Sequence, residues 1–174
     1  MARDHARLLV STWDDAEFVS LTTSAQSVYF SLISSPDLSW CGVAPLLPQR
    51  LIRNAADLTE RKVKQAMADL AERRFLIIDT DTAEVLVRTY VRHDGILKQP
   101  NVTKALVRAL DRVHSAALVE VVKGELGRLL TDEPDHKGWD AIRSGWPELF
   151  AELHAKAIPN PSANPSNKPL RKVG

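Results

Sequence analysis

The feature of this sequence that most constrains its fold is a change of hydrophobic period near residue 75. Ahead of it, Thr59 offers an N-cap, and apolar residues then recur at the i, i+3, i+4 and i+7 positions of one helix face. These apolar residues are Val63, Ala66, Met67 and Leu70. Behind it, Phe75 to Ile78 and Glu84 to Val91 are β-type runs on either side of a polar turn. The sequence therefore predicts a helix to about Arg74, followed by a β-hairpin.

Two further helices are predicted ahead of this one. Ala25 to Ser34 carries apolar residues at helical spacing, and Pro48 to Ala55 begins with a proline that suits a first helical turn. Leu38 to Ala44, between them, is expected to be a loop or a short strand, and Arg7 to Ser11 a short strand or an extended arm. This order predicts a mainly α fold with a small β-hairpin, a winged helix-turn-helix.

The chain becomes helical again beyond Gly95. One helix is predicted from Pro100 or Asn101 to Val113, a second after Ser115, and a short third helix from Trp146, with a polar linker over residues 131–137. We therefore expect a winged-helix domain in residues 1–95 and a C-terminal helical extension in residues 96–157. The proline-rich residues 158–174 are expected to form a disordered basic tail.

Composition narrows the class of protein. Among the 174 residues, 44% are hydrophobic and 26% charged, which is ordinary for a globular protein. The charged N-terminus and the lack of a long apolar run predict no signal peptide and no membrane span. The single cysteine, Cys41, cannot form an internal disulfide. We expect a protein of the cytoplasm of a bacterial host cell.

No catalytic motif is evident. The sequence has neither a phosphate-binding glycine loop nor histidines paired at i, i+3 or i, i+4. Asp79, Asp81 and Glu84 could be drawn as a metal site, but a solvated hairpin turn explains them more simply. Cys41 is expected to be a small buried apolar residue rather than a nucleophile. We therefore expect a protein that is not an enzyme and that holds no cofactor and no metal.

The informative charges lie in the middle of the chain. The net charge is only +1, but residues 86–112 hold six Lys or Arg against two Asp or Glu. With its apolar stripe turned inward, the helix after Thr59 displays basic and polar side chains outward, namely Arg61, Lys62, Lys64 and Gln65. These residue types suit the major groove of DNA. The alternative is an ordinary solvated helix face.

A second set of basic residues is expected to contact phosphates on either side of that helix. It comprises Arg50, Arg53, Arg92, Lys98 and Lys104. Lys104, Arg108 and Arg112 recur at i, i+4 and i+8, which an ordinary wet helix face would explain equally well. The hairpin turn, Asp79 to Glu84, is acidic and would be repelled by phosphate, so we expect its tip to point away from bound DNA.

Three segments carry a resemblance to a known group of proteins. They are ARDHARLLVSTWDDAEFVSL, PDLSWCGVAPLLPQRL and LVRTYVRHDGILKQPNV. Over residues 2–112 the chain resembles small winged-helix DNA-binding proteins of actinobacterial phages and prophages. These are similar in turn to the N-terminal domains of phage replisome organisers and replication initiators. The resemblance implies a non-catalytic protein that binds double-stranded DNA in phage replication initiation. It also implies that Lys98, Gln99 and Asn101 lie near the DNA side.

Two other functions remain open from the sequence. A transcriptional regulator of the prophage repressor type would differ from an initiator in where its site lies, over a promoter rather than in an origin. A winged-helix protein adaptor would agree with the small net charge and the acidic turn. Replication or transcription proteins are possible partners. A homodimer through the C-terminal helices is also open, because an apolar stripe on the helix after Ser115 is either a dimer surface or part of the core. The stripe comprises Leu118, Val119, Val122, Leu126 and Leu129.

Overall fold

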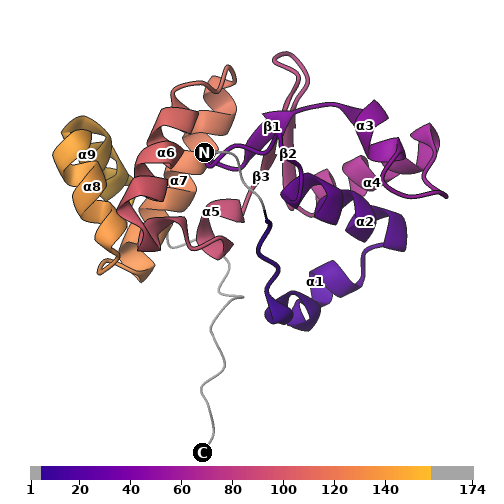
Figure 1. Cartoon of the computed structure of the whole chain (residues 1–174), viewed down its shortest axis with the longest axis horizontal. Coiled ribbons are helices and arrows are strands. Elements are labelled where there is room, and N and C mark those ends of the chain that lie inside the picture. The colour runs from indigo at the N-terminus through magenta and orange to yellow at the C-terminus, as the bar shows by residue number, and fades with distance from the viewer. Residues whose placement is uncertain (1–4, 158–174) are drawn as a thin grey trace, which may run out of the picture.

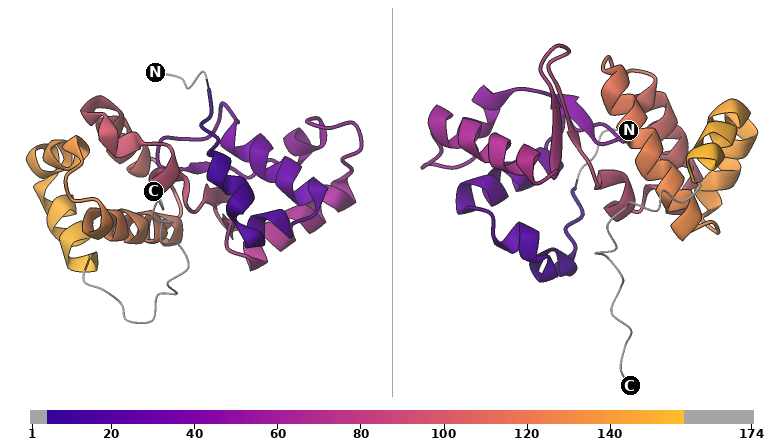
Figure 2. Two further views of the ribbon diagram at one scale, coloured as in Figure 1. Left: turned by 90° about the horizontal axis from the view of Figure 1, so that it is seen from below. Right: turned by 180° about the vertical axis from the view of Figure 1, so that it is seen from behind.

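The computed structural model describes residues 5–157, so the expected C-terminal tail lies outside the described residues. The chain is mainly helical, with one small antiparallel sheet of three strands in the described part (Figure 1). Helices α2, α3 and α4 lie on one side of the sheet, and α6 to α9 lie on the other (Figures 1 and 2). One cluster of buried apolar side chains runs from Phe18 to Leu153, through both sides.

The three helices predicted in the first half are confirmed as α2 (Thr23–Ile33), α3 (Pro48–Ile52) and α4 (Glu60–Glu72). The Thr22 hydroxyl caps α2 by accepting a hydrogen bond from Ala25 N–H, and the Thr59 hydroxyl caps α4 by accepting one from Lys62 N–H. Helix α3 is shorter than expected, because the chain turns after Ile52. Helix α4 packs against both α2 and α3.

The sheet consists of β1 (Val43–Pro45), β2 (Leu76–Asp79) and β3 (Glu84–Val87), in the order β1-β3-β2. The hairpin is confirmed, with Ile78 opposite Val85. The expectation that its second strand runs to Val91 is wrong. All four residues of β3 are buried, and the chain then turns into the short helix α5 (Tyr90–His93). Tyr90 and Val91 extend the apolar pattern of the strand, but they are buried as part of helix α5 and not as part of the strand.

The N-terminal segment begins as the extended arm that was one of the two expectations, and it forms no strand among the described residues. A 3₁₀ helix, η1 (Val10–Asp14), and a short helix, α1 (Ala16–Val19), follow; neither was predicted. The Asp15 carboxylate caps α1 by accepting hydrogen bonds from Glu17 and Phe18 N–H. The Phe18 ring then lies 5.3 to 5.8 Å from the rings of Tyr29, Phe30 and Phe75. This aromatic cluster anchors the segment to the core.

The C-terminal extension comprises η2 (Ile96–Lys98), α6 (Pro100–Leu110), α7 (Ala116–Asp132), α8 (Lys137–Gly145) and α9 (Pro147–Lys156). Helix α8 was not predicted. It buries Trp139, whose indole N–H donates to the Glu133 carbonyl, and it packs against α6. Its sequence hides this helix, because Gly138 and Gly145 have low helix propensity.

The apolar stripe of α7 is core. Leu118, Val122, Leu126 and Leu129 are each at most 4% exposed within a single chain. These four residues therefore cannot form the dimer surface that was one of the two interpretations of this stripe, whose fifth residue, Val119, is partly buried. No helix among residues 5–157 combines the length and apolar character needed to span a bilayer.

Candidate nucleic-acid interface

Helix α4 turns its two faces as its sequence predicts. Val63, Ala66, Met67 and Leu70 are buried, and the helix packs through them against the rest of its side of the molecule. On the opposite face Arg61, Lys64 and Gln65 are exposed, while Lys62 is partly covered. Thr59 fixes where the helix begins, and so places three basic residues within its first two turns.

The outward side chains of α4 differ in whether they form ion pairs or hydrogen bonds within the chain. The structure gives Arg61 and Lys64 no ion pair and no side-chain hydrogen bond with any residue in 5–157. The Lys62 ammonium lies 2.9 Å from the Asp57 carboxylate, and its hydrogen bond holds the pKa of Asp57 below the ordinary value. The Gln65 amide donates to Asp69 at 2.7 Å along the same helix. Both contacts are exposed and cost little to break, so four side chains remain available for a ligand.

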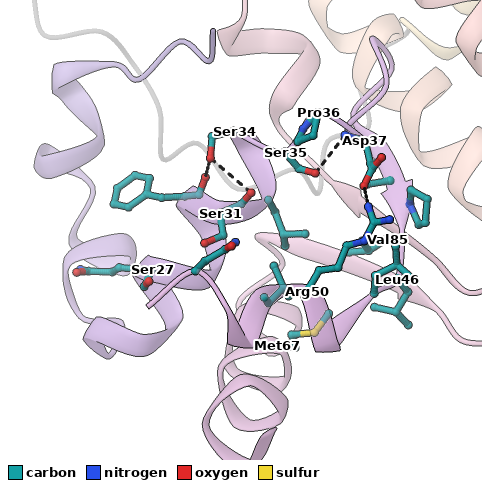
Figure 3. A pocket seen from close by; sticks show the side chains of 18 of the residues that line it. Ser27, Ser31, Ser34, Ser35, Pro36, Asp37, Leu46, Arg50, Met67 and Val85 are labelled. Carbon is teal, nitrogen blue, oxygen red and sulfur yellow. Dashed lines mark hydrogen bonds and ion pairs between the residues drawn. The ribbon is translucent and has the colours of Figure 1, made fainter. Parts of the chain in front are cut away.

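The predicted contacts of helix α3 lie beside a groove. Arg50 forms an ion pair with Asp37, and both side chains line a groove of about 710 Å³ between α2 and the β1–α3 segment (Figure 3). Arg53, at the C-cap of α3, is exposed and has no recorded partner in the described chain. Arg53 is therefore the free cation of this pair, whereas Arg50 must first leave Asp37.

Arg92, which the sequence predicts to contact phosphate, is paired with carboxylates of the extension. Its guanidinium lies 3.0 Å from the Glu125 carboxylate and 3.2 Å from Asp132, on α7. Arg88 and Arg128 approach Glu125 as well, at 3.2 and 2.6 Å. The Glu125 side chain is only 2% exposed, and although burial acts against ionisation, hydrogen bonding and charge from these arginines lower its pKa. Arg92 therefore attaches α5 to α7, and a phosphate would compete with these two carboxylates for its guanidinium.

The remaining predicted residues lie on the extension. Lys98, Gln99, Asn101 and Lys104 are all exposed. Helix α6 packs against η2 and α8, whereas α4 packs against α2, α3 and β2. Figures 1 and 2 show α4 and α6 in opposite parts of the molecule. The structure thus does not bring these residues next to the α4 cations.

The acidic hairpin turn has a structural role. Glu84 is 9% exposed, and its carboxylate accepts hydrogen bonds from the backbone N–H groups of His114 and Ser115, at 3.1 and 2.7 Å. Although burial opposes it, these hydrogen bonds hold the pKa of Glu84 below its ordinary value. The solvated-turn interpretation is therefore wrong for Glu84. Asp79 stays nearer solvent and accepts hydrogen bonds from Asp81 and Thr82 N–H.

The His93 to Asn101 segment, which carries part of the family resemblance, forms the corner between α5 and α6. Gly95 adopts a left-handed conformation with φ of 69°. Ile96 and Leu97 are buried behind it, and the Thr103 hydroxyl donates to the Ile96 carbonyl at 3.1 Å. This geometry explains the glycine and the apolar pair, and it leaves Lys98 and Gln99 on the surface.

Sequence reasoning did not single out Glu125, although a signal was present. Glu125 lies seven residues after Leu118, and so falls on the buried stripe of its helix. A carboxylate at such a position needs charged partners, because an unpaired buried charge is costly. The partners themselves could not be identified from spacing, since Arg88 and Arg92 precede Glu125 by 37 and 33 residues.

Within residues 5–157 no three His, Cys, Asp or Glu side chains come together as a group that could hold a metal ion. Cys41 is buried, its burial raises its pKa, and its sulfur lies 3.1 Å from the Ser39 hydroxyl. Comparison of the chain with models of known protein families, with characterised proteins and with solved structures gives no match.

Proposed function

We propose that this chain binds double-stranded DNA as a winged-helix protein, with α4 as the recognition helix. The observation that carries the proposal is the pair of free cations, Arg61 and Lys64, on the exposed face of the first two turns of α4. An arginine there can bond guanine O6 and N7, and a lysine can bind a phosphate. The opposite face of α4 is buried, which fixes the direction in which these side chains point.

The order of the elements supports this assignment. A helix, a strand, two helices and an antiparallel hairpin follow one another as α2, β1, α3, α4, β2 and β3, which is the winged-helix order. Arg53 lies on α3, directly before the turn that leads to α4. In this proposal it contacts a phosphate at the edge of the groove, and Arg50 joins it when its exposed pair with Asp37 opens.

The biological role that we propose is phage or prophage replication initiation. It rests on the resemblance over residues 2–112. In this role the α4 side binds the origin, and the extension (α6 to α9) is the part available to replication proteins. A transcriptional regulator would use the same DNA surface, so the two roles separate by whether the selected site lies in an origin or over a promoter.

The test is fluorescence anisotropy with a labelled duplex of about 25 base pairs, at low and at moderate salt. The paired variants are Arg61→Glu/Lys64→Glu on α4 and Lys104→Glu/Arg108→Glu on α6. Both make the same change of charge on exposed helix faces. We expect the α4 variant to weaken binding by about tenfold or more, and the α6 variant to change it by less than about threefold.

Two other outcomes would change or end the DNA proposal. Binding that survives the α4 variant and is lost in the α6 variant would move the DNA surface to the extension. No binding of the unmodified protein at low salt would end the DNA proposal, because non-specific phosphate attraction should be measurable there.

One observation favours a second candidate, a protein adaptor. The N-terminal segment exposes several large apolar side chains, with Leu8 49%, Val10 87%, Trp13 53% and Val19 50% accessible. Exposed apolar residues gathered on one short segment are typical of protein-binding surfaces. The adaptor would become the preferred function if the anisotropy experiment showed no DNA binding.

A further inference from the structure

A small pocket lies between the N-terminal arm, the α5–η2 corner and the end of α7. Its volume is about 170 Å³. Basic groups dominate its polar lining, namely Arg7, Arg92, His93, Lys98 and His136. Glu133 is the carboxylate that lines it. None of the α4 residues contributes to this pocket, so it is separate from the surface proposed above to bind DNA.

Two of these basic side chains lie beside the same glycine, Gly95. A Cβ atom placed on Gly95 would lie 3.0 Å from Nη1 of Arg7 and 3.7 Å from Cδ of Lys98. The arm therefore places its guanidinium over the left-handed glycine, alongside the Lys98 chain. The structure gives neither Arg7 nor Lys98 an anionic partner among residues 5–157. An anion beside Gly95 would be attracted by the Arg7 guanidinium, and the flexible Lys98 side chain could bring its ammonium to the same anion.

The other charges of the pocket are already in use. Arg92 is paired with Glu125 and Asp132, and the Glu133 carboxylate contacts Nε2 of His136. Desolvation of its ring and the neighbouring Arg92 guanidinium hold the pKa of His93 below its ordinary value, which disfavours its charged form. The charge left to attract a ligand is therefore that of Arg7 and Lys98.

The size of the pocket restricts the ligand. It is several times larger than a water molecule, which takes about 30 Å³ in the liquid. It is smaller than the roughly 300 Å³ at which pockets for drug-sized ligands begin. A nucleotide is too large for this pocket. One tetrahedral oxyanion fits its volume and carries enough negative charge to pair with two cations. Arginine is well suited to such a group, because its planar N–H donors match phosphate oxygens.

We propose that this pocket binds a single phosphate group, held between Arg7 and Lys98 above Gly95. The phosphate can come from two sources, a free phosphate ion or a phosphodiester of a DNA backbone. This proposal does not depend on α4 binding DNA. It also gives a role to the His93 to Lys98 part of the resemblance segment, which the groove contacts of α4 do not explain.

The test is an NMR titration of the ¹⁵N-labelled full chain with inorganic phosphate, with sodium chloride at matched ionic strength as the blank. The reporters are the Gly95 amide and the Arg7 side-chain Nε–H. The variants are Arg7→Gln and Lys98→Gln, and Lys104→Gln is the matched control. All three side chains are exposed, so their removal should leave the fold intact, which the amide spectrum itself verifies.

We expect saturable shifts of both reporters with phosphate and none with chloride. Arg7→Gln and Lys98→Gln should each weaken phosphate binding by about tenfold, and Lys104→Gln by less than about twofold. A second titration uses a duplex of about 25 base pairs. Saturation by phosphate identifies free phosphate as sufficient, and movement of the two reporters with duplex alone identifies the phosphodiester.

Two results would overturn the proposal. One is that neither phosphate nor duplex moves the Gly95 and Arg7 signals. The other is that Lys104→Gln weakens binding as much as Arg7→Gln does, which would indicate general attraction to positive charge rather than a site. If duplex binding fails altogether while phosphate still saturates the pocket, the DNA function falls and the phosphate site stands.

Discussion

The carboxylate of Glu84, on the central strand, accepts hydrogen bonds from the backbone N–H groups of Ser115 and His114 at the start of α7, at 2.7 and 3.1 Å. A helix N-terminus has unsatisfied N–H groups and a partial positive charge, and a carboxylate satisfies both. The acidic hairpin turn, which sequence alone suggested was solvated, thus attaches the sheet to the helical extension.

Stability should fall in acid through this contact. The pKa of Glu84 is lower in the folded chain than its ordinary value of 4.5. Its stabilising effect is therefore complete above that value and is lost as the pH falls through the folded pKa. Glu84→Gln should lower the free energy of unfolding by about 1 to 3 kcal/mol at neutral pH and reduce its loss between about pH 5 and pH 3.

Urea unfolding at a series of pH values measures this effect. Asp81→Asn is the control, because Asp81 is exposed in the same turn and should change the profile little. A Glu84→Gln profile with the slope of the unmodified protein would contradict the assignment.

Of two ion-pair sites on α7, the one at Glu125 should contribute more to the stability of the fold. Glu125 is 2% exposed and meets three arginines, whereas Glu120 is 55% exposed and pairs with Lys123 and Lys156. Glu125→Gln should cost about 2 to 3 kcal/mol, below the roughly 3 to 5 kcal/mol of a fully buried pair because the arginines keep solvent contact. Glu120→Gln should lower the stability much less, because solvent screens an exposed ion pair. If denaturant unfolding gave equal losses of stability for the two variants, the Glu125 cluster would hold α5 against α7 no more strongly than an exposed ion pair does.

The sequence predicts local elements well where one face is apolar. The stripe from Val63 to Leu70 and the cap at Thr59 are sufficient to place α4 and its outward residues. It fails where the cause is a distant partner. Arg92 reads as a free cation until Glu125, 33 residues away, is placed beside it. Helix α8 is missed because its stability comes from burying Trp139 rather than from its own propensity.

Two glycines in neighbouring helices should respond to alanine in opposite directions. A Cβ on Gly138 would lie 2.7 Å from the Leu97 carbonyl oxygen, so Gly138→Ala forces α8 away from the α5–α6 corner. It should cost about 1 to 3 kcal/mol. Gly124, on α7, has nothing within 4 Å of a Cβ, and Gly124→Ala should stabilise by about 0.5 to 1 kcal/mol. Thermal unfolding of both variants checks this, and a stabilised Gly138→Ala protein would contradict the close packing.

The most direct test of the central claim, that α4 contacts DNA, is to map the amide signals that change when a duplex of about 25 base pairs is added to the ¹⁵N-labelled chain at low salt. We expect shifts or broadening at Arg61 to Gln65 and at Arg53, with the Lys104 to Arg108 amides of α6 unchanged. Changes confined to α6, or no change on α4 at saturating duplex, would contradict it.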